Sequence, residues 1–169
     1  MRVARSVWVE APPESVWRFI ADPAHYLHFM DGITRWEVEG RRRTGLGARY
    51  RVLMHVGSAE IGGLVEVVEH VPNRELAWAS VIGTAQRGRW RIRPDRTDPG
   101  RTRVELRIGG TAGGGFIGQL AGVVAQPAIA RHVRRSLREL RRQVEHEEER
   151  AQHRRGGTAG RSRNSAPAR

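Results

Sequence analysis

The stretch that decides the fold is VWVEAPPESVWRFIAD, residues 7–22. A short apolar strand, predicted over residues 3–10, runs into Pro12 and Pro13, and these two residues open a helix. A proline suits the first turn of a helix because the N–H that it lacks has no partner there. Almost no residues connect the strand to the helix. The sequence therefore predicts a sharp corner between a β-strand and an α-helix near the start of the chain.

The middle of the chain reads as a series of short strands. Asp22 is the expected N-cap of a second short helix that runs through Leu27. Beyond it, polar and apolar residues alternate with period two, and turn residues separate the runs. These patterns predict six consecutive antiparallel strands, over residues 33–39, 48–56, 60–70, 76–80, 85–93 and 104–108. Their apolar positions share one face, which we expect to be buried.

A long amphipathic helix closes the predicted fold. It follows a glycine-rich link at residues 109–115 and carries apolar residues at spacings of three and four from Ile117 to Val144. Pro127 should bend it, because proline removes one helix hydrogen bond. We expect one folded domain over residues 1–147. Residues 148–169 are polar and basic, and we expect them to form a disordered tail.

Composition narrows the class of protein. The 169 residues suit a single domain, and the absence of cysteine excludes disulfides, thiolate metal sites and a cysteine nucleophile. It also suits a reducing cytoplasm. The chain starts without a charged-then-apolar leader, and its longest weakly polar stretch, residues 116–130, is shorter than the ~20 residues that span a bilayer. We therefore predict a cytoplasmic protein without a transmembrane segment.

The formal net charge of +12 is only weak evidence for a polyanionic partner. All 30 basic residues are arginine, which points to codon bias in a GC-rich organism of the actinobacterial type. Five of them lie in the last 19 residues, so the rest of the chain carries about +7. Rows of arginine along residues 87–93 and 131–142 are compatible with a ribosome, an RNA or an anionic membrane as partner. A solvated exterior explains them equally simply, and we favour it.

Three phrases carry a resemblance to a known superfamily. They are GLGARY at residues 45–50, VVEHVPNRELAW at 67–78 and LREL at 137–140, together with the opening corner. With the order strand, two helices, six strands and one helix, the chain resembles the START-like, or SRPBCC, helix-grip superfamily. Its members include polyketide cyclase/dehydrase-type and lipid-transfer proteins. The resemblance implies an α+β fold in which a curved seven-stranded antiparallel sheet grips the C-terminal helix around a hydrophobic cavity.

Candidate ligand-binding residues follow from the inward strand faces and the last helix. Pocket walls are mostly apolar and aromatic, and this chain places Trp on several inward positions. The alternative is that these side chains fill a solid core. The expected lining residues are Trp36, Tyr50, Val52, Met54, Trp78, Ser80, Trp90, Ile92, Leu106, Phe116, Leu120 and Val124, with His28 and Met30 at the cavity mouth.

Signals for other chemistry are weak. His25 and His28, within reach of Asp22 or Asp31, lack the fixed spacing to a further ligand that a metal site requires, so no metal or cofactor is predicted. The glycines at residues 109–115 lack the Lys-Ser/Thr of a phosphate-binding loop, and a hinge for the last helix explains them better. No acidic residue is expected on an inward strand face. The expected inward polar groups are Thr34, Tyr50, Ser80, Gln86 and the indole N–H groups.

The leading hypothesis is a protein that binds or carries a hydrophobic small molecule, such as a lipid, a polyketide or another apolar metabolite. A polyketide aromatase/cyclase or dehydratase is the first alternative, although the sequence shows no catalytic residue set. A basic module that associates with a ribosome, RNA or an anionic membrane is the second. We expect a monomer or a homodimer.

Overall fold

The computed structural model describes residues 2–56, 58–83, 85–110 and 116–161, and it describes their side chains except at residues 56, 59, 116–125 and 156–161. Seven antiparallel strands form one sheet in the order β1-β7-β6-β5-β4-β3-β2. The strands are β1 (Arg2–Val9), β2 (Ile33–Glu39), β3 (Arg49–Val56), β4 (Ala59–Val71), β5 (Glu75–Gly83), β6 (Gln86–Pro94) and β7 (Thr102–Gly110). The predicted seven-stranded helix-grip fold is confirmed.

The opening corner forms as predicted. Helix α1 (Pro13–Ala21) starts directly after β1, with Pro12 as its N-cap. The buried Thr102 hydroxyl at the start of β7 donates a hydrogen bond of 2.7 Å to the Ala11 carbonyl. This bond fixes the corner to the sheet, because the carbonyl of a turn residue would otherwise be buried without a donor. Sequence reasoning missed Thr102, which lies 91 residues from its partner.

Two short helical segments follow α1. A 3-10 turn, η1 (Pro23–His25), leads into α2 (Tyr26–Phe29). The Asp22 carboxylate accepts a hydrogen bond of 2.9 Å from the Ala24 N–H, which confirms the predicted N-cap. The Tyr26 hydroxyl donates to the Ile20 carbonyl at 2.8 Å and so ties α2 to the end of α1.

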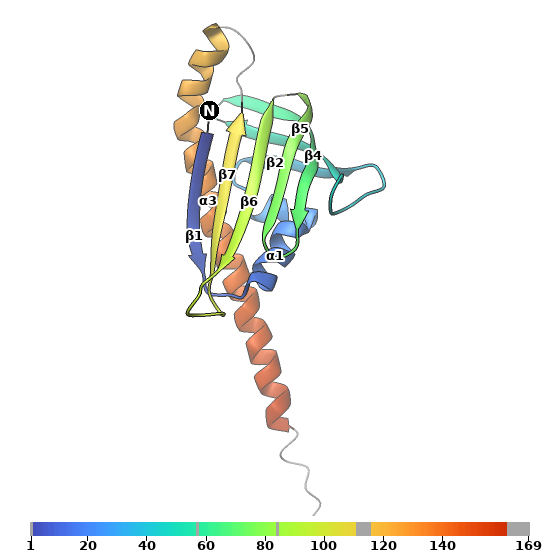
Figure 1. Cartoon of the computed structure of the whole chain (residues 1–169), viewed down its shortest axis with the longest axis vertical. Helices are drawn as coiled ribbons and strands as arrows, with labels where there is room; N and C mark the ends of the chain where they lie inside the picture. Colours follow the sequence, from blue (N-terminus) through green and yellow to red (C-terminus); the bar gives the residue numbers. More distant parts are fainter. Residues whose placement is uncertain (1, 57, 84, 111–115, 162–169) are drawn as a thin grey trace, which may run out of the picture.

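Helix α3 (Phe116–Arg161) runs the length of the sheet and continues beyond it (Figure 1). It packs chiefly along β1, with fewer contacts to β7 and β3. Its described buried residues recur at helical spacing and join the core of the domain: Ile129, Val133, Ser136, Leu137, Leu140 and Val144. Over the strands farther from β1, the inner face of the sheet is covered by α1, α2 and large side chains.

The described part of the expected tail, residues 148–161, is helical, whereas residues 162–169 lie outside the described residues. The helix continues to Arg161, well past the end of the apolar stripe. Glu148 still contacts the domain, since its carboxylate accepts a hydrogen bond of 2.7 Å from the Ser15 hydroxyl. Residues 149–155 are rich in Glu, Arg, Ala and Gln, which favour helix without needing a buried face, whereas the glycines at 156, 157 and 160 do not favour it. Amphipathic periodicity therefore marked where packing ends, and the helix extends beyond that point.

Candidate functional site

Six aromatic rings meet between the sheet and its covering helices. The Tyr26 ring of α2 stacks on Trp36 of β2 at 4.1 Å between ring centroids. Trp36 in turn contacts Tyr50 at 5.5 Å and meets the Trp78 ring edge-on at 5.9 Å. The aromatic cluster, as we name it, consists of Tyr26, Phe29, Trp36, Tyr50, Trp78 and Trp90. Every one of these side chains is buried.

A glycine on the neighbouring strand makes room for Trp78. Gly88 of β6 lies opposite Trp78 of β5 in the sheet register. A Cβ atom placed on Gly88 would overlap the six-membered ring of the Trp78 indole. The indole therefore lies flat across the backbone of β6 instead of standing away from the sheet. This arrangement brings Trp78 within contact of Trp36 and Tyr26.

The polar ends of the two tyrosines are occupied by backbone carbonyls. The Tyr50 hydroxyl donates a hydrogen bond of 2.9 Å to the Arg43 carbonyl. Burial raises the pKa of Tyr50 to about 12, and burial raises that of Tyr26 further. Both phenols are therefore protonated at neutral pH. Each keeps its hydrogen in a bond to the protein, so the tyrosines present oxygen lone pairs, not free donors, to the interior.

Two buried indole N–H groups have no hydrogen-bond partner in the described part of the chain. Among the described residues, no hydrogen-bond acceptor reaches Nε1 of Trp36 or Nε1 of Trp90. The Trp90 indole lies close enough to Tyr26 to lower the pKa of its phenol, although burial outweighs this effect. Leaving a buried donor unsatisfied is unfavourable by about 1–3 kcal/mol. The cluster thus combines apolar area with a small number of polar atoms whose hydrogen-bonding capacity is not satisfied.

Most of the predicted lining residues come together on the inner face. Val52, Ile92 and Leu106 are buried in the same core as the aromatic cluster, and Met54 packs against it. Ser80 is half-buried, and its hydroxyl is engaged with the backbone of Gln86, accepting from the N–H at 2.9 Å. The side chains of Phe116, Leu120 and Val124 lie outside the part of the chain described in that detail, as does the glycine link at residues 111–115.

The prediction that Thr34 faces inward is wrong. Thr34 is exposed, because the register between β2 and β3 shifts between Ile33 and Arg35. A bulge of this kind turns a side chain from one face of the sheet to the other. The alternation of period two resumes at Trp36, which is why the rest of β2 follows the prediction.

The two residues predicted at the cavity mouth line a groove at one edge of the domain. His28 lies on α2 and Met30 directly follows it, and the α2–β2 segment, residues 27–33, faces α3 across a hollow of about 770 Å³. Met30 is itself buried. On the α3 side, the Gln143 amide donates a hydrogen bond of 2.9 Å to the His28 carbonyl and so fixes one end of the groove.

A histidine and an aspartate that sequence reasoning did not connect lie beside this groove. Nδ1 of His132 on α3 is 2.5 Å from a carboxylate oxygen of Asp31, and the Asp31 N–H donates to the Ser136 hydroxyl at 2.9 Å. The His132 ring covers Gly32, where a Cβ would lie 2.8 Å from Cε1. An aspartate bound to Nδ1 holds an imidazole in one orientation, with Nε2 as its remaining polar atom. The 101 residues between the partners explain why no spacing pattern indicated the pair.

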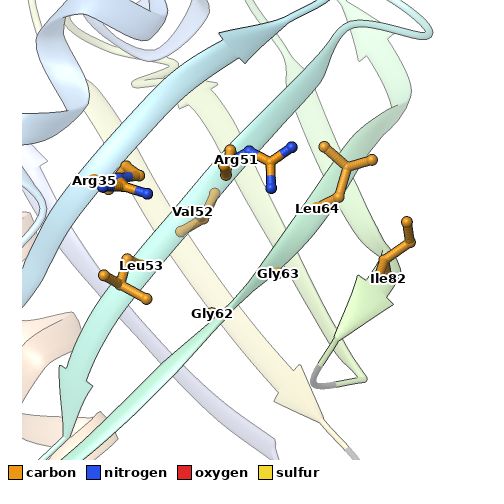
Figure 2. A pocket seen from close by; sticks show the side chains of 8 residues that line it. All are labelled: Arg35, Arg51, Val52, Leu53, Gly62, Gly63, Leu64 and Ile82. Carbon is orange, nitrogen blue, oxygen red and sulfur yellow. The ribbon is translucent and has the colours of Figure 1, made fainter.

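A smaller hollow lies on the opposite face of the sheet. Figure 2 shows Arg35 and Leu53 on one side of it and Leu64 and Ile82 on the other, with the bare backbone of β4 between them. It measures about 250 Å³. Its two arginines are both paired with glutamates of β2, Arg35 with Glu37 and Arg51 with Glu39. It does not communicate with the aromatic cluster, which lies on the other face.

The arginine row on β6 is partly neutralised by two glutamates. Arg89, Arg91 and Arg93 converge on Glu75 of β5 at 2.9, 3.4 and 2.9 Å, and Arg89 also pairs with Glu69 at 2.7 Å. Partial burial opposes ionisation of Glu75, but the hydrogen bond from Arg93 and the charges of Arg91 and Arg89 outweigh it, so its pKa is lowered. These ion pairs relieve part of the repulsion along the row.

A curled antiparallel sheet around a long C-terminal helix, with an aromatic interior, defines a helix-grip protein. A model of the family described as polyketide cyclase / dehydrase and lipid transport matches residues 1–145. The chain belongs to this family. No curated protein matches the sequence.

Solved structures share the fold at low sequence identity. TTHA0849 from Thermus thermophilus is 22% identical, with 85% of this chain and 97% of that one covered and a TM-score of 0.73. The ZhuI aromatase/cyclase from Streptomyces sp. R1128 is 20% identical over 86% and 93% of the two chains, with a TM-score of 0.70. The di-domain aromatase/cyclase BexL of the BE-7585A biosynthetic pathway is 19% identical over 86% of this chain and 46% of its own, with a TM-score of 0.65.

The described residues include neither a membrane-spanning helix nor a cluster of metal ligands. No helix among them is both long and apolar enough to cross a membrane. No group of three or more His, Asp or Glu side chains in the described part of the chain is placed to hold a metal ion, and His25 instead lies 3.7 Å from Asp22.

Proposed function

We propose that this protein binds a hydrophobic small molecule against the aromatic cluster, between the sheet and helix α3. The proposal rests on what covers the inner face of the sheet. Helix α3 packs along β1, whereas the inner face of β2, β3, β5 and β6 is lined by aromatic side chains. Rings that pack on one another give a large apolar wall with few polar atoms, which is the usual composition of a ligand pocket. The family description, which includes lipid transport, agrees with this function.

We further propose that the protein carries the ligand in the cytoplasm as a monomer or a homodimer. A chain without cysteine suits that compartment. Native mass spectrometry of the purified protein tests carriage directly. We expect a bound apolar molecule that organic solvent extracts, and a protein mass that corresponds to one or two chains.

Binding is tested by titrating the protein with a fluorescent apolar dye. Replacing Trp78 by Leu removes a central ring of the cluster, so we expect dye affinity to fall about tenfold through lost apolar contact. Trp8→Leu is the matched control, since Trp8 is 38% exposed on β1, outside the cluster, and should leave affinity unchanged. A folded Trp78→Leu protein that binds dye as tightly as the wild type contradicts the proposal.

A polyketide cyclase or dehydratase activity is the second candidate, and the Asp31–His132 pair favours it. An imidazole oriented by a carboxylate can move a proton during a condensation or elimination of water. His132→Asn should then abolish turnover of a poly-β-ketone surrogate and leave dye binding unchanged. Ser136→Ala, which removes only the hydroxyl beneath Asp31, serves as the control for structural damage. Absence of turnover by the wild-type protein leaves binding as the function.

A further inference from the structure

The groove between the α2–β2 segment and α3 has a wall of cations and an apolar floor. Arg135, Arg138, Arg141 and Arg142 line it from α3. The opposite wall runs from Leu27 to Ile33, and Leu27 is 49% exposed. The groove is large enough, at about 770 Å³, to hold a small molecule, and nothing in the proposed function requires its cations.

The cations of this wall are unevenly neutralised. Arg142 is held by Glu139 through two hydrogen bonds, at 2.5 and 3.1 Å. Arg135 and Arg141 are each 3.9 Å from a carboxylate, those of Asp31 and Glu145. Within the described part of the chain, no carboxylate lies within ion-pair distance of Arg138. Its guanidinium is therefore available, in the middle of the row.

Spacing places three of these guanidiniums together. Arg135, Arg138 and Arg142 follow one another at intervals of three and four residues, so they share one face of α3. Planar guanidinium groups bind carboxylate and phosphate oxygens through paired N–H donors. An exposed ion pair by itself contributes little to affinity. A ligand of this groove must also cover apolar surface, and the exposed Leu27 and the half-buried Ile33 offer that surface opposite the arginines.

We propose that this groove binds a single-chain amphipathic anion free in solution. Its acidic head, a carboxylate or a phosphate, lies on Arg138 and Arg142, and its apolar portion lies along Leu27 and Ile33. The carboxylate of Glu139 competes with the ligand for Arg142. The groove shares only the buried Phe29 with the aromatic cluster, so the proposal stands whether or not the interior binds a ligand.

Isothermal titration with dodecyl phosphate and dodecanoate, below their micelle concentrations, tests the site. Both should bind. Inorganic phosphate, which lacks the apolar chain, and dodecyl maltoside, which lacks the acidic head, should each bind at least about tenfold more weakly. Arg138→Gln should weaken dodecyl phosphate binding about tenfold. Glu139→Gln should tighten it several-fold by releasing Arg142. Arg150→Gln, an exposed arginine of α3 outside the groove, is the matched control.

Three outcomes overturn the proposal. One is that the wild type and Arg138→Gln bind dodecyl phosphate with equal affinity. Another is that Arg150→Gln loses as much affinity as Arg138→Gln, which indicates attraction to net charge alone. The third is Arg138-dependent binding to anionic phosphatidylglycerol vesicles without binding of the monomeric amphiphiles. Loss of amphiphile binding in Trp78→Leu but not in Arg138→Gln places the amphiphile in the interior, which supports the proposed function and rejects this groove.

Discussion

At the scale of single residues, the interior depends on which side chains are missing as well as on which are present. Gly88 leaves the space that the Trp78 indole occupies, and the indole then reaches Trp36 and Tyr26. Alternation along β5 and β6 predicted that Trp78 and Trp90 face inward. It did not predict that a glycine lies opposite Trp78, because the pairing of two strands depends on a register that neither strand shows by itself.

Gly88→Ala should lower the free energy of unfolding by about 3 kcal/mol, because the new methyl group overlaps the Trp78 ring and overpacked cores lose stability. Chemical denaturation followed by circular dichroism measures the loss. Adding Trp78→Leu to the Gly88→Ala chain should recover part of it, since the smaller side chain vacates the space. If the two substitutions are simply additive, the steric explanation is incorrect.

At the scale of elements, side chains from distant parts of the chain hold the structure together. Glu75 of β5 receives three guanidiniums from β6, and Asp31 receives His132 from α3. The outward arginines of β6 were predicted from alternation. Their convergence on Glu75 was not, because Glu75 lies just before the predicted strand at residues 76–80 and only the sheet brings it opposite Arg91. The bulge that exposes Thr34 has no sequence signal either.

Stability should fall in acid through Glu75. Its pKa is lowered from 4.5 in the folded protein, so its ionised form stabilises the fold at neutral pH. That contribution should be lost as the pH drops below about 4.5 and through the folded pKa. Glu75→Gln should reduce the free energy of unfolding by about 1–2 kcal/mol at pH 7, and the difference from the wild type should shrink in acid. Glu66→Gln, which removes an exposed pair with Arg49, should change stability by less than about 0.5 kcal/mol at either pH.

At the scale of the whole molecule, the architecture was predictable and the details of the site were not. The corner at Pro12 and Pro13, the period-two strands and the long helix were each visible locally, and their order matched a single fold. The groove, by contrast, is made of residues 27–33 and of α3, which are more than 100 positions apart. Its arginines were noted in the sequence as a band on a helix, without the apolar wall that faces them.

The domain should end close to residue 151. The family match ends at residue 145, and among the residues whose side chains the structure describes, the buried core positions of α3 end at Val144. Deleting residues 152–169 should therefore leave the melting temperature within about 2 °C of the full chain. Deleting residues 140–169 should prevent folding, since it removes the buried Leu140 and Val144. Calorimetry of both truncated proteins is the measurement. A large loss of stability in the shorter truncation shows that the projecting helix belongs to the domain.

The pairing of the first strand with the last has a consequence for how the protein is made. Strand β1 is bonded along its length to β7, in a register that joins Arg2 to Gly109. At about 5–20 residues per second, roughly 5 to 20 seconds of translation separate the two strands. During that interval the aromatic face of the sheet has neither its edge strand nor its long helix, and it is exposed to water. Contacts so far apart in the chain also slow folding. The newly made chain is thus most vulnerable to aggregation in the seconds before its last third has emerged from the ribosome.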